Sequence, residues 1–169
     1  MHIRIATPAD AEAIAAAEAE TQCTPGLLVG WPGDFPVEAY REKIVMLAEH
    51  GRYIVAEENG APVGHALLEP LSLHVHGVAH VFLLTIVVHP GHLERGIGRT
   101  LLRDLLGWAQ RDTRVGKIEL NVRAGNLRAQ NFYRSLGFIE EARFVKRVRR
   151  LDGHFEDDLG MAWFPSRPD

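Results

Sequence analysis

The chain of 169 residues has a single cysteine, Cys23, and therefore cannot form an internal disulfide bond. No apolar run approaches the ~18 residues of a transmembrane helix, so the sequence predicts neither secretion nor a membrane span, and the default expectation is a cytoplasmic location. Neither positively nor negatively charged residues are in large excess. The 19 basic and 22 acidic residues give a formal net charge of −3, which argues against a broad nucleic-acid-binding surface. The length and the 46% hydrophobic content predict one domain, residues 1–169.

The first third of the sequence predicts a strand followed by two helices. Residues 2–6 alternate in polarity, and the TPAD stretch at 7–10 has the threonine, proline and aspartate of a helix start before an alanine-rich segment. Residues 21–36 contain three prolines and three glycines, which predicts an ordered loop. A second helix is expected over 37–50, with Gly51 as its C-terminal cap.

The rest of the sequence predicts a hairpin, then alternating strands and helices, then a second hairpin. The expected segments are a hairpin turning at Asn59-Gly60, a nearly all-apolar strand within 78–90, a helix over 97–111, a strand over 117–122, a helix over 126–136, and two strands that turn at Asp152-Gly153. An all-apolar strand is expected to be covered on both faces.

The stretch VVHPGHLERGIGRTLL, residues 87–102, leads from β-branched residues through a glycine-rich turn into the leucine helix. Glycine costs about 1 kcal/mol relative to alanine inside a helix, so Gly96 and Gly98 at a helix start predict a close approach to the backbone. Helix N-termini carry unpaired N–H groups and a partial positive charge, so an anion is the expected partner. A turn that serves only tight strand-to-helix packing is the alternative.

Two familiar phosphate-binding loops do not match this turn. A Rossmann fingerprint needs a third glycine where Leu101 stands. A Walker loop needs lysine and then serine or threonine where Ile97 and Gly98 stand. A nicotinamide-dependent oxidoreductase is therefore disfavoured.

Several motifs in a fixed order together resemble one family. Val-x-Pro at 88–90, Gly-x-Gly at 96–98, Asn-x-x-Ala-x-x-x-Tyr at 126–133 and Leu-Gly-Phe at 136–138 resemble the GNAT superfamily of acetyl-CoA-dependent N-acetyltransferases. The closing stretch from Gly137 to Trp163 is similar to members that acetylate amino acids or protein N-termini.

The resemblance implies an α/β (α+β) fold of the GNAT type. Its sheet would be mixed and mostly antiparallel, with seven strands and four helices in the order β-α-α-β-β-β-α-β-α-β-β. The strands that end at Val88 and Val122 would splay apart, and acetyl-CoA would lie in the gap between them.

The same resemblance assigns the donor site residue by residue. The expected cofactor-binding residues are Ile86, Val88, Leu93, Glu94, Arg95, Gly96, Ile97, Gly98, Arg99 and Asn126. The family usually has glutamine or arginine three residues before the first motif glycine, where this chain has Leu93. Leucine cannot donate a hydrogen bond to phosphate, so weaker cofactor binding is expected, with Arg95 or Arg99 as compensating donors.

Acetyl transfer to an amine needs a base, an oxyanion donor and an acid. The Val88 N–H is the expected oxyanion donor. Tyr133 matches the family tyrosine that protonates the leaving thiolate, although a tyrosine that only packs in the core is the alternative. Glu119 is the first choice of base against the alternative of a solvated surface charge, and His80 is in reserve.

Five histidines fall within nineteen positions, at His74, His76, His80, His89 and His92. No cysteine or aspartate nearby completes a ligand set, so no metal is expected.

The sequence thus predicts an enzyme that moves the acetyl group of acetyl-CoA to a primary amine of a small molecule, an amino acid or a peptide N-terminus by direct attack. A non-catalytic acyl-CoA-binding sensor is the alternative. The net charge of −3 and the acidic residues Glu156, Asp157 and Asp158 favour an amino acid or peptide over nucleic acid. No membrane partner is expected, and a homodimer is left open.

Overall fold

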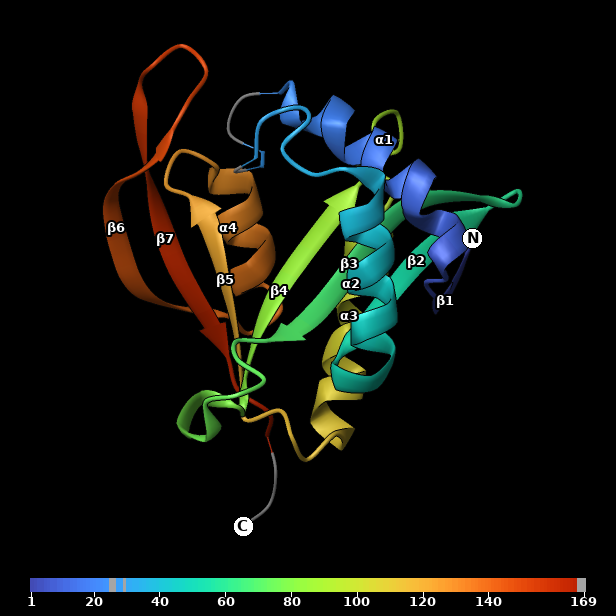
Figure 1. Ribbon diagram of the computed structural model, residues 1–169. Coiled ribbons are helices and arrows are strands. Elements are labelled where there is room, and N and C mark those ends of the chain that lie inside the picture. Colours follow the sequence, from blue (N-terminus) through green and yellow to red (C-terminus); the bar gives the residue numbers. More distant parts are fainter. Residues whose placement is uncertain (25–26, 29, 167–169) are drawn as a thin grey trace.

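The computed structural model describes residues 1–24, 27–28 and 30–166. The strands are β1 (His2–Ile5), β2 (Arg52–Glu58), β3 (Ala61–Pro70), β4 (Val81–Val88), β5 (Lys117–Arg123), β6 (Ile139–Arg149) and β7 (Phe155–Trp163). The helices are α1 (Ala11–Gln22), α2 (Val37–His50), α3 (Ile97–Arg111) and α4 (Leu127–Arg134), with the short 3-10 helices η1 (Pro8–Asp10) and η2 (His76–Val78) (Figure 1). This element order is the predicted one.

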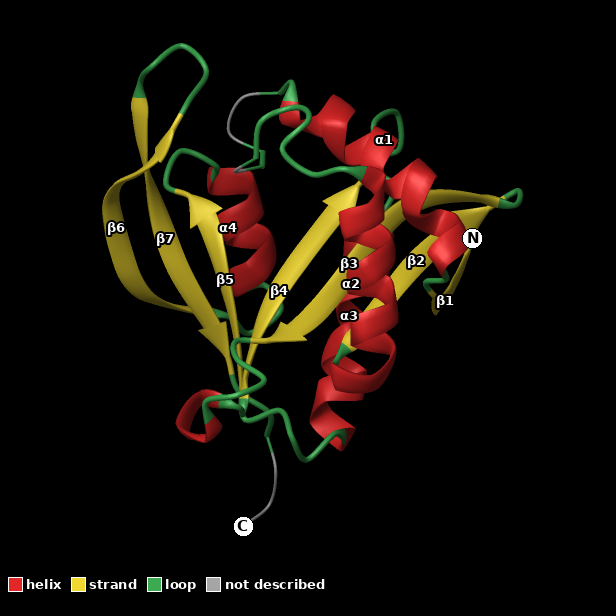
Figure 2. Ribbon diagram, viewed as in Figure 1, coloured by secondary structure: helices red, strands yellow, loops and turns green. Residues whose placement is uncertain are grey.

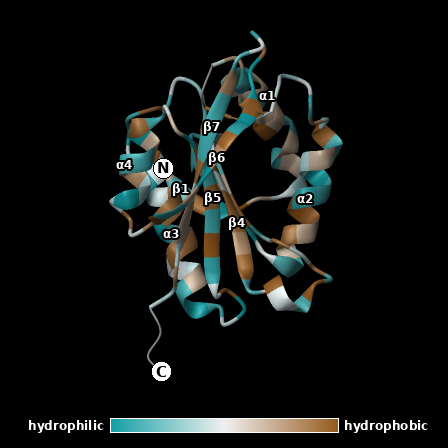
Figure 3. Ribbon diagram, turned by 90° about the vertical axis from the view of Figure 1, so that its left-hand side faces the viewer, coloured by the Kyte–Doolittle hydropathy of each residue, from teal (hydrophilic) through white to brown (hydrophobic). Residues whose placement is uncertain are grey.

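The seven strands form one sheet in the order β1-β2-β3-β4-β5-β7-β6. Only the β4–β5 pair is parallel, and the other neighbours are antiparallel. Helices α1 and α2 cover one face of the sheet, whereas α3 and α4 cover the other (Figure 3). The prediction of a mixed, mostly antiparallel sheet is confirmed.

The sheet opens between its two parallel strands. Strand β4 pairs with β5 only where Val81–Leu83 lie opposite Lys117–Glu119, but it pairs with β3 as far as Val88. Beyond Leu83 the two strands diverge (Figure 2), as the splay prediction required. The backbone N–H and C=O groups along this side of β4 have no strand to bind. Val81, Phe82 and Leu84 of β4 are buried, whereas Leu83, Ile86 and Val88 are only half-buried because they line the opening, so the expected cover on both faces is incomplete.

Each face of the sheet has its own hydrophobic core. Between the sheet and α3, the fully buried Leu101, Leu102 and Leu105 pack against Phe82 and Ile118. On the other face, α1 and α2 contribute Ile14, Ile44 and Leu47, which pack against Tyr53 and Leu67 of the sheet. Burial of one such side chain contributes about 1.5–3 kcal/mol, so the two cores hold the sheet rigid up to the edge of the opening.

Helix α1 begins as predicted and ends slightly later. The carboxylate of Asp10 accepts the Thr7 N–H at 2.7 Å, which satisfies one of the unpaired donors at the helix start. Helix α1 then runs to Gln22, into the expected loop 21–36. Residues 25–26 and 29 of that loop lie outside the described residues.

Gly51 ends helix α2 for a reason other than the expected one. Its φ of −156° is extended rather than left-handed. A Cβ at this position would stand 2.2 Å from the Leu68 carbonyl oxygen of β3. Glycine is therefore needed for close approach to the neighbouring strand. By contrast, Asn59 and Gly60 have the two positive φ angles, 52° and 80°, of the predicted tight hairpin.

Candidate active site

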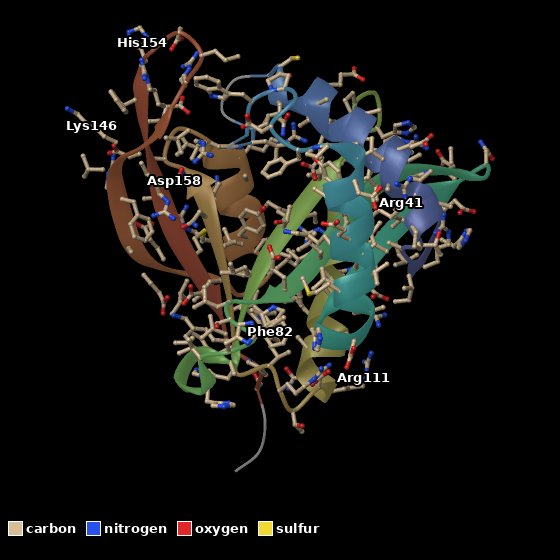
Figure 4. All side chains as sticks on the ribbon, in the orientation of Figure 1. Arg41, Phe82, Arg111, Lys146, His154 and Asp158 are labelled. Atoms are coloured by element: carbon tan, nitrogen blue, oxygen red, sulfur yellow. The ribbon has the colours of Figure 1, made fainter. Side chains whose placement is uncertain are left out.

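The divergence of β4 and β5 opens a cleft of about 570 Å³. One wall consists of β4, the turn that follows it and the start of α3, and we call it the β4 wall. The opposite wall consists of β5 and α4, and we call it the β5 wall. Phe82 lies at the end where the two strands still pair, and Asp158 of β7 lies beside the diverging part of β5 (Figure 4).

The cleft brings together every predicted site residue except Arg95. Those that line it are Ile86, Val88, Leu93, Glu94, Gly96, Ile97, Gly98, Arg99, Glu119, Asn126 and Tyr133. Arg95 does not line it: its guanidinium forms an ion pair with Glu58 at 2.8 Å and donates to His92 at 2.9 Å. Of the two arginines expected to compensate for Leu93, only Arg99 is therefore in the cleft.

The turn between β4 and α3 exposes backbone donors to the cleft. Gly91, Glu94 and Gly96 have positive φ angles of 79°, 64° and 79°. Gly96 is the N-cap of α3, and no side chain caps the helix. The first N–H groups of a helix have no intrahelical partner and carry a partial positive charge. The first turn of α3 has no acidic residue to offset that charge, so this end of the cleft suits an anion.

The two motif glycines are glycines for different reasons. A left-handed φ explains Gly96, which has open space around it. A Cβ at Gly98 would meet Val88, Phe132 and Ile86 at ordinary distances of 3.4 to 3.9 Å. Tight packing within the described residues therefore does not require glycine at position 98.

Two arginines flank this end of the cleft from opposite walls. Arg99 of α3 donates to the Ser135 hydroxyl at 3.1 Å and lies 5.8 Å from the Phe132 ring centroid. Arg128 of α4 lines the cleft and pairs with Glu94 at 2.9 Å. Sequence reasoning missed Arg128, although its place two residues after the motif asparagine could have revealed it. Leu93 is 51% exposed, so no other side chain fills its place.

Tyr133 is held by aromatic packing on the β5 wall. Its ring lies 5.3 Å from that of Phe132 and 5.7 Å from that of Phe138, between centroids. Within residues 1–24, 27–28 and 30–166, its hydroxyl has no hydrogen-bond partner. Burial raises the pKa of Tyr133 to about 12, so the hydroxyl keeps its proton at neutral pH. Asn126 accepts the Ala129 N–H at 3.0 Å and thereby caps the helix that carries Tyr133.

Two carboxylates lie in one row across the sheet on the side of the cleft that faces α1. Glu69 of β3 is in register with Leu83 of β4, and Leu83 is in register with Glu119 of β5. Lys43 binds Glu69 at 3.0 Å, and Lys117 binds Glu119 at 2.7 Å. Each carboxylate thus has a lysine partner, although Lys117 also binds Glu141 at 2.7 Å. Sequence reasoning missed Glu69 because a charge near a strand end resembles a solvated one.

Of the histidine-rich segment, His92 lines the cleft, whereas the reserve base His80 is exposed and does not. No group of three or more histidine, cysteine, aspartate or glutamate residues in the described parts of the chain could hold a metal ion.

A buried ion pair completes the β5 wall. Arg123 of β5 lies directly across from Asp158 of β7, and their side chains bind each other. Arg123 is 5% exposed and Asp158 is 1% exposed. Arg123 lines the cleft, so the pair joins the wall to the rest of the sheet.

Comparison with known families gives the class of this protein. A sequence model of the acetyltransferase (GNAT) family matches residues 15–138, and the chain therefore belongs to that family. It is an acetyl-CoA-dependent N-acetyltransferase, which decides between an enzyme and a non-catalytic sensor. No helix among the residues that the structure describes is long and apolar enough to cross a membrane.

Particular relatives are similar over most of the chain. It is 35% identical over 156 residues to the N-alpha-acetyltransferase RimI of Mycobacterium tuberculosis, covering 87% of this chain and 83% of the relative. It is 28% identical over 121 residues to the spermidine N(1)-acetyltransferase of Vibrio cholerae, covering 71% and 66%.

Solved structures agree with this fold. The ribosomal-protein-alanine N-acetyltransferase of Brucella melitensis has a TM-score of 0.86 at 28% identity and covers 97% of this chain and 99% of its own. A putative acetyltransferase of Salmonella typhimurium, solved with its cofactor acetyl-CoA, has a TM-score of 0.87 at 23% identity and covers 100% and 98%.

Proposed function

We propose that this enzyme acetylates the primary amine of a peptide N-terminus or an amino acid, which attacks the thioester of acetyl-CoA directly. The observation that supports this most is Tyr133, which lines the cleft with its ring held by Phe132 and Phe138 and its hydroxyl without a hydrogen-bond partner among the described residues. A sensor would need the donor site but no acid, whereas acyl transfer needs both.

The β4 wall would hold the donor through its backbone. The turn from Leu93 to Arg99 and the first N–H groups of α3 suit the diphosphate, and Arg99 and Arg128 add positive charge beside it. The open edge of β4 at Ile86 and Val88 offers hydrogen bonds to the amides of the pantetheine arm. When bound, acetyl-CoA supplies an acetyl group activated as a thioester.

The chemistry would divide among three groups. The Val88 N–H stabilises the oxyanion that develops on the carbonyl, and Tyr133 gives its proton to the departing sulfur. Glu119 takes the proton of the attacking amine. Because Lys117 binds the Oε1 of Glu119, the second oxygen, Oε2, is the one that accepts this proton.

The charge of the cleft favours an N-terminal amine over a polyamine. Lys43 binds Glu69, and Lys117 binds Glu119 as well as Glu141, so neither carboxylate of this row is an unpaired charge that would attract an acceptor with several amines. Among the relatives described above, the one named for protein N-termini is 35% identical and the one named for spermidine is 28% identical.

A turnover screen tests the acceptor class. Release of CoA is measured with short peptides that have free N-termini, with free amino acids, with spermidine and with tRNA. The matched control is each peptide with its N-terminus already acetylated. We expect the highest kcat/KM with a free-amine peptide or amino acid and no turnover with the blocked one. An equal or higher kcat/KM with spermidine, or acetylation of tRNA alone, would overturn the proposal.

A further inference from the structure

A chain of buried polar side chains outside the cleft links α1, β3 and the turn after β4. Glu18 Oε1 lies 2.9 Å from His65 Nε2, and His65 Nδ1 lies 2.9 Å from His89 Nε2. At the far end, His89 Nδ1 lies 3.0 Å from the Pro62 carbonyl oxygen. The Tyr40 hydroxyl donates to the other oxygen of Glu18 at 2.8 Å. His65 has no exposed surface, and His89 is 5% exposed.

The hydrogen bonds fix where the protons lie in this chain. The Pro62 carbonyl can only accept, so His89 carries a proton on Nδ1. Burial, and then the nearby His65, lower the pKa of His89 to about 4, so its Nε2 is a bare acceptor at neutral pH. His65 must therefore donate from Nδ1.

One further proton is required between His65 and Glu18. A neutral His65 that donates from Nδ1 would turn a bare Nε2 toward a carboxylate oxygen at 2.9 Å, with no hydrogen between them. Burial would raise the pKa of Glu18, but hydrogen bonds and charge from His65, together with the Tyr40 hydroxyl, outweigh it and lower that pKa. The Tyr40 hydroxyl donates to the other oxygen of Glu18 and thereby favours its carboxylate form, which assigns the extra proton to His65.

The other ionisable groups near this pair do not supply the proton. Burial raises the pKa of Tyr40 and of Tyr53, whose ring lies 5.9 Å from that of His65, so both stay neutral. Lys43 of α2 lowers the pKa of Glu18 through its charge and is bound to Glu69.

His89 is also the anchor of the turn that leads to the donor site. Its N–H donates to the Val63 carbonyl at 3.1 Å, and its own carbonyl accepts the His92 N–H at 3.1 Å. With the ring bound to Pro62, three hydrogen bonds fix the first residue of the turn, and two of them hold it against the start of β3. His92 and the next residue, Leu93, already line the cleft. At the other end of the chain, Thr21 lies one turn after Glu18 on α1 and lines the cleft from the opposite face of the sheet.

We propose that Glu18, His65 and His89 are positioning residues whose continuous hydrogen bonds, with His65 doubly protonated, hold the donor-binding turn in place against α1. The inference rests on the proposed role of that turn in binding acetyl-CoA. None of the three residues lines the cleft, so their loss is expected to change the affinity for acetyl-CoA and to leave the chemical step nearly unchanged.

Two substitutions of Glu18 distinguish the effect of an unbroken hydrogen-bond chain from the effect of the ion pair. In Glu18→Gln, the amide nitrogen can donate to a neutral His65 while the amide oxygen still accepts from Tyr40, so the chain stays continuous without the ion pair. In Glu18→Ala both the hydrogen-bond chain and the ion pair are broken. Glu20→Ala, an exposed glutamate on the same helix, is the matched control. We expect the Kd for acetyl-CoA to rise about tenfold in Glu18→Ala, and to stay within about threefold of the parent in Glu18→Gln and Glu20→Ala. The kcat at saturating substrates should stay within about threefold in all three.

The protonation of His65 is measured independently by the ¹⁵N resonances of its imidazole at pH 7. We expect both ring nitrogens to carry protons in the parent and only Nδ1 in Glu18→Gln. A bare Nε2 in the parent would overturn the proton assignment. An unchanged Kd in Glu18→Ala would overturn the positioning role.

A variant at the other end of the chain is available if Glu18→Ala does not fold. His89→Asn keeps a donor for Pro62 but removes the acceptor for His65, and it should also weaken acetyl-CoA binding. An unchanged Kd in this variant would contradict the inference. If calorimetry showed no binding of acetyl-CoA to the parent, the proposed function would fail while the ¹⁵N result would still decide the proton assignment.

Discussion

The two walls of the cleft differ in which atoms they present. The β4 wall offers mainly backbone: an open strand edge beyond Leu83, a turn with three positive φ angles, and an uncapped helix start. The β5 wall offers side chains, among them Tyr133 and Arg123. The β4 wall should therefore tolerate changes of side chain but not of backbone conformation, and the β5 wall should show the reverse.

The difference follows from how each strand is supported. Strand β4 is paired along its whole length with β3, so its backbone is rigid even where the other edge is open. Strand β5 is paired with β7 as far as Arg123, where the buried pair with Asp158 joins the two strands. The β5 wall is therefore held by strand pairing and, in addition, by a buried ion pair at its open end.

The largest expected effect is on the stability of the β5 wall. Asp158→Ala removes the carboxylate that binds the buried Arg123 guanidinium and leaves only Glu156, at 3.8 Å, as a counter-charge, so the loss of unfolding free energy should be about 3 kcal/mol, at the low end of what breaking a buried pair costs. Chemical denaturation measures the loss. Asp152→Ala, in the exposed turn of the same hairpin, is the control and should leave the midpoint nearly unchanged. Equal midpoints for the two variants would show that the pair does not hold the wall.

The next effect is on catalysis by the same wall. Tyr133→Phe keeps the packed ring and removes the proton, so kcat should fall about a hundredfold or more while the Kd for acetyl-CoA stays nearly constant. Because the pKa of Tyr133 is about 12, the parent should lose no activity through this group between pH 7 and pH 10. Tyr53→Phe, at a buried hydroxyl that has no hydrogen-bond partner among the described residues, is the control for loss of a phenol. A drop of threefold or less, about 0.65 kcal/mol, would remove Tyr133 from the mechanism.

On the β4 wall, a change at the backbone should act on binding alone. Gly96→Glu adds a negative charge and a Cβ at a left-handed φ of 79°, so the Kd for acetyl-CoA should rise at least tenfold. Gly153→Glu has the same strain at a φ of 85° in the β6–β7 turn and is the matched control. Equal acetyl-CoA binding by both variants in calorimetry would contradict the phosphate-cradle hypothesis.

The difference between the two walls also explains which features could be predicted from the sequence. The β4 wall is local: the glycines, the helix start and the strand before it are adjacent in the chain, and helix α3 begins and ends at the predicted residues. Nearby residues on that wall could still not be assigned by sequence. Arg95 points away from the cleft because Glu58 of β2 binds it. Arg99 stays in the cleft, where its guanidinium donates to the Ser135 hydroxyl from the opposite wall.

Contacts between distant segments were beyond sequence reasoning. The hydrogen-bond chain from Glu18 through His65 to His89 joins three parts of the fold, and its successive members are 47 and 24 residues apart in the sequence. The histidine-rich segment suggested His89 only as one of five neighbours, whereas its partner is outside that segment. Glu69 and Glu119 are brought into one row by strand register, which the spacing of charges along the chain does not reveal.

The smallest expected effect is a gain on the β4 wall. Leu93 stands where the family usually has a phosphate donor, is 51% exposed and lines the cleft. Leu93→Arg adds a cation that should reach the diphosphate, but Glu94 competes for it and solvent screens it, so the gain should be about 1 kcal/mol, or roughly fivefold in Kd. Val45→Arg, at an exposed valine on α2, adds the same charge away from the cleft and is the control. Raising the salt concentration should shrink the gain, since an exposed ion pair is screened. Unchanged or weaker acetyl-CoA binding by Leu93→Arg at low salt would mean that this position does not face the diphosphate, and Arg99 and Arg128 would then be the cations that the turn relies on.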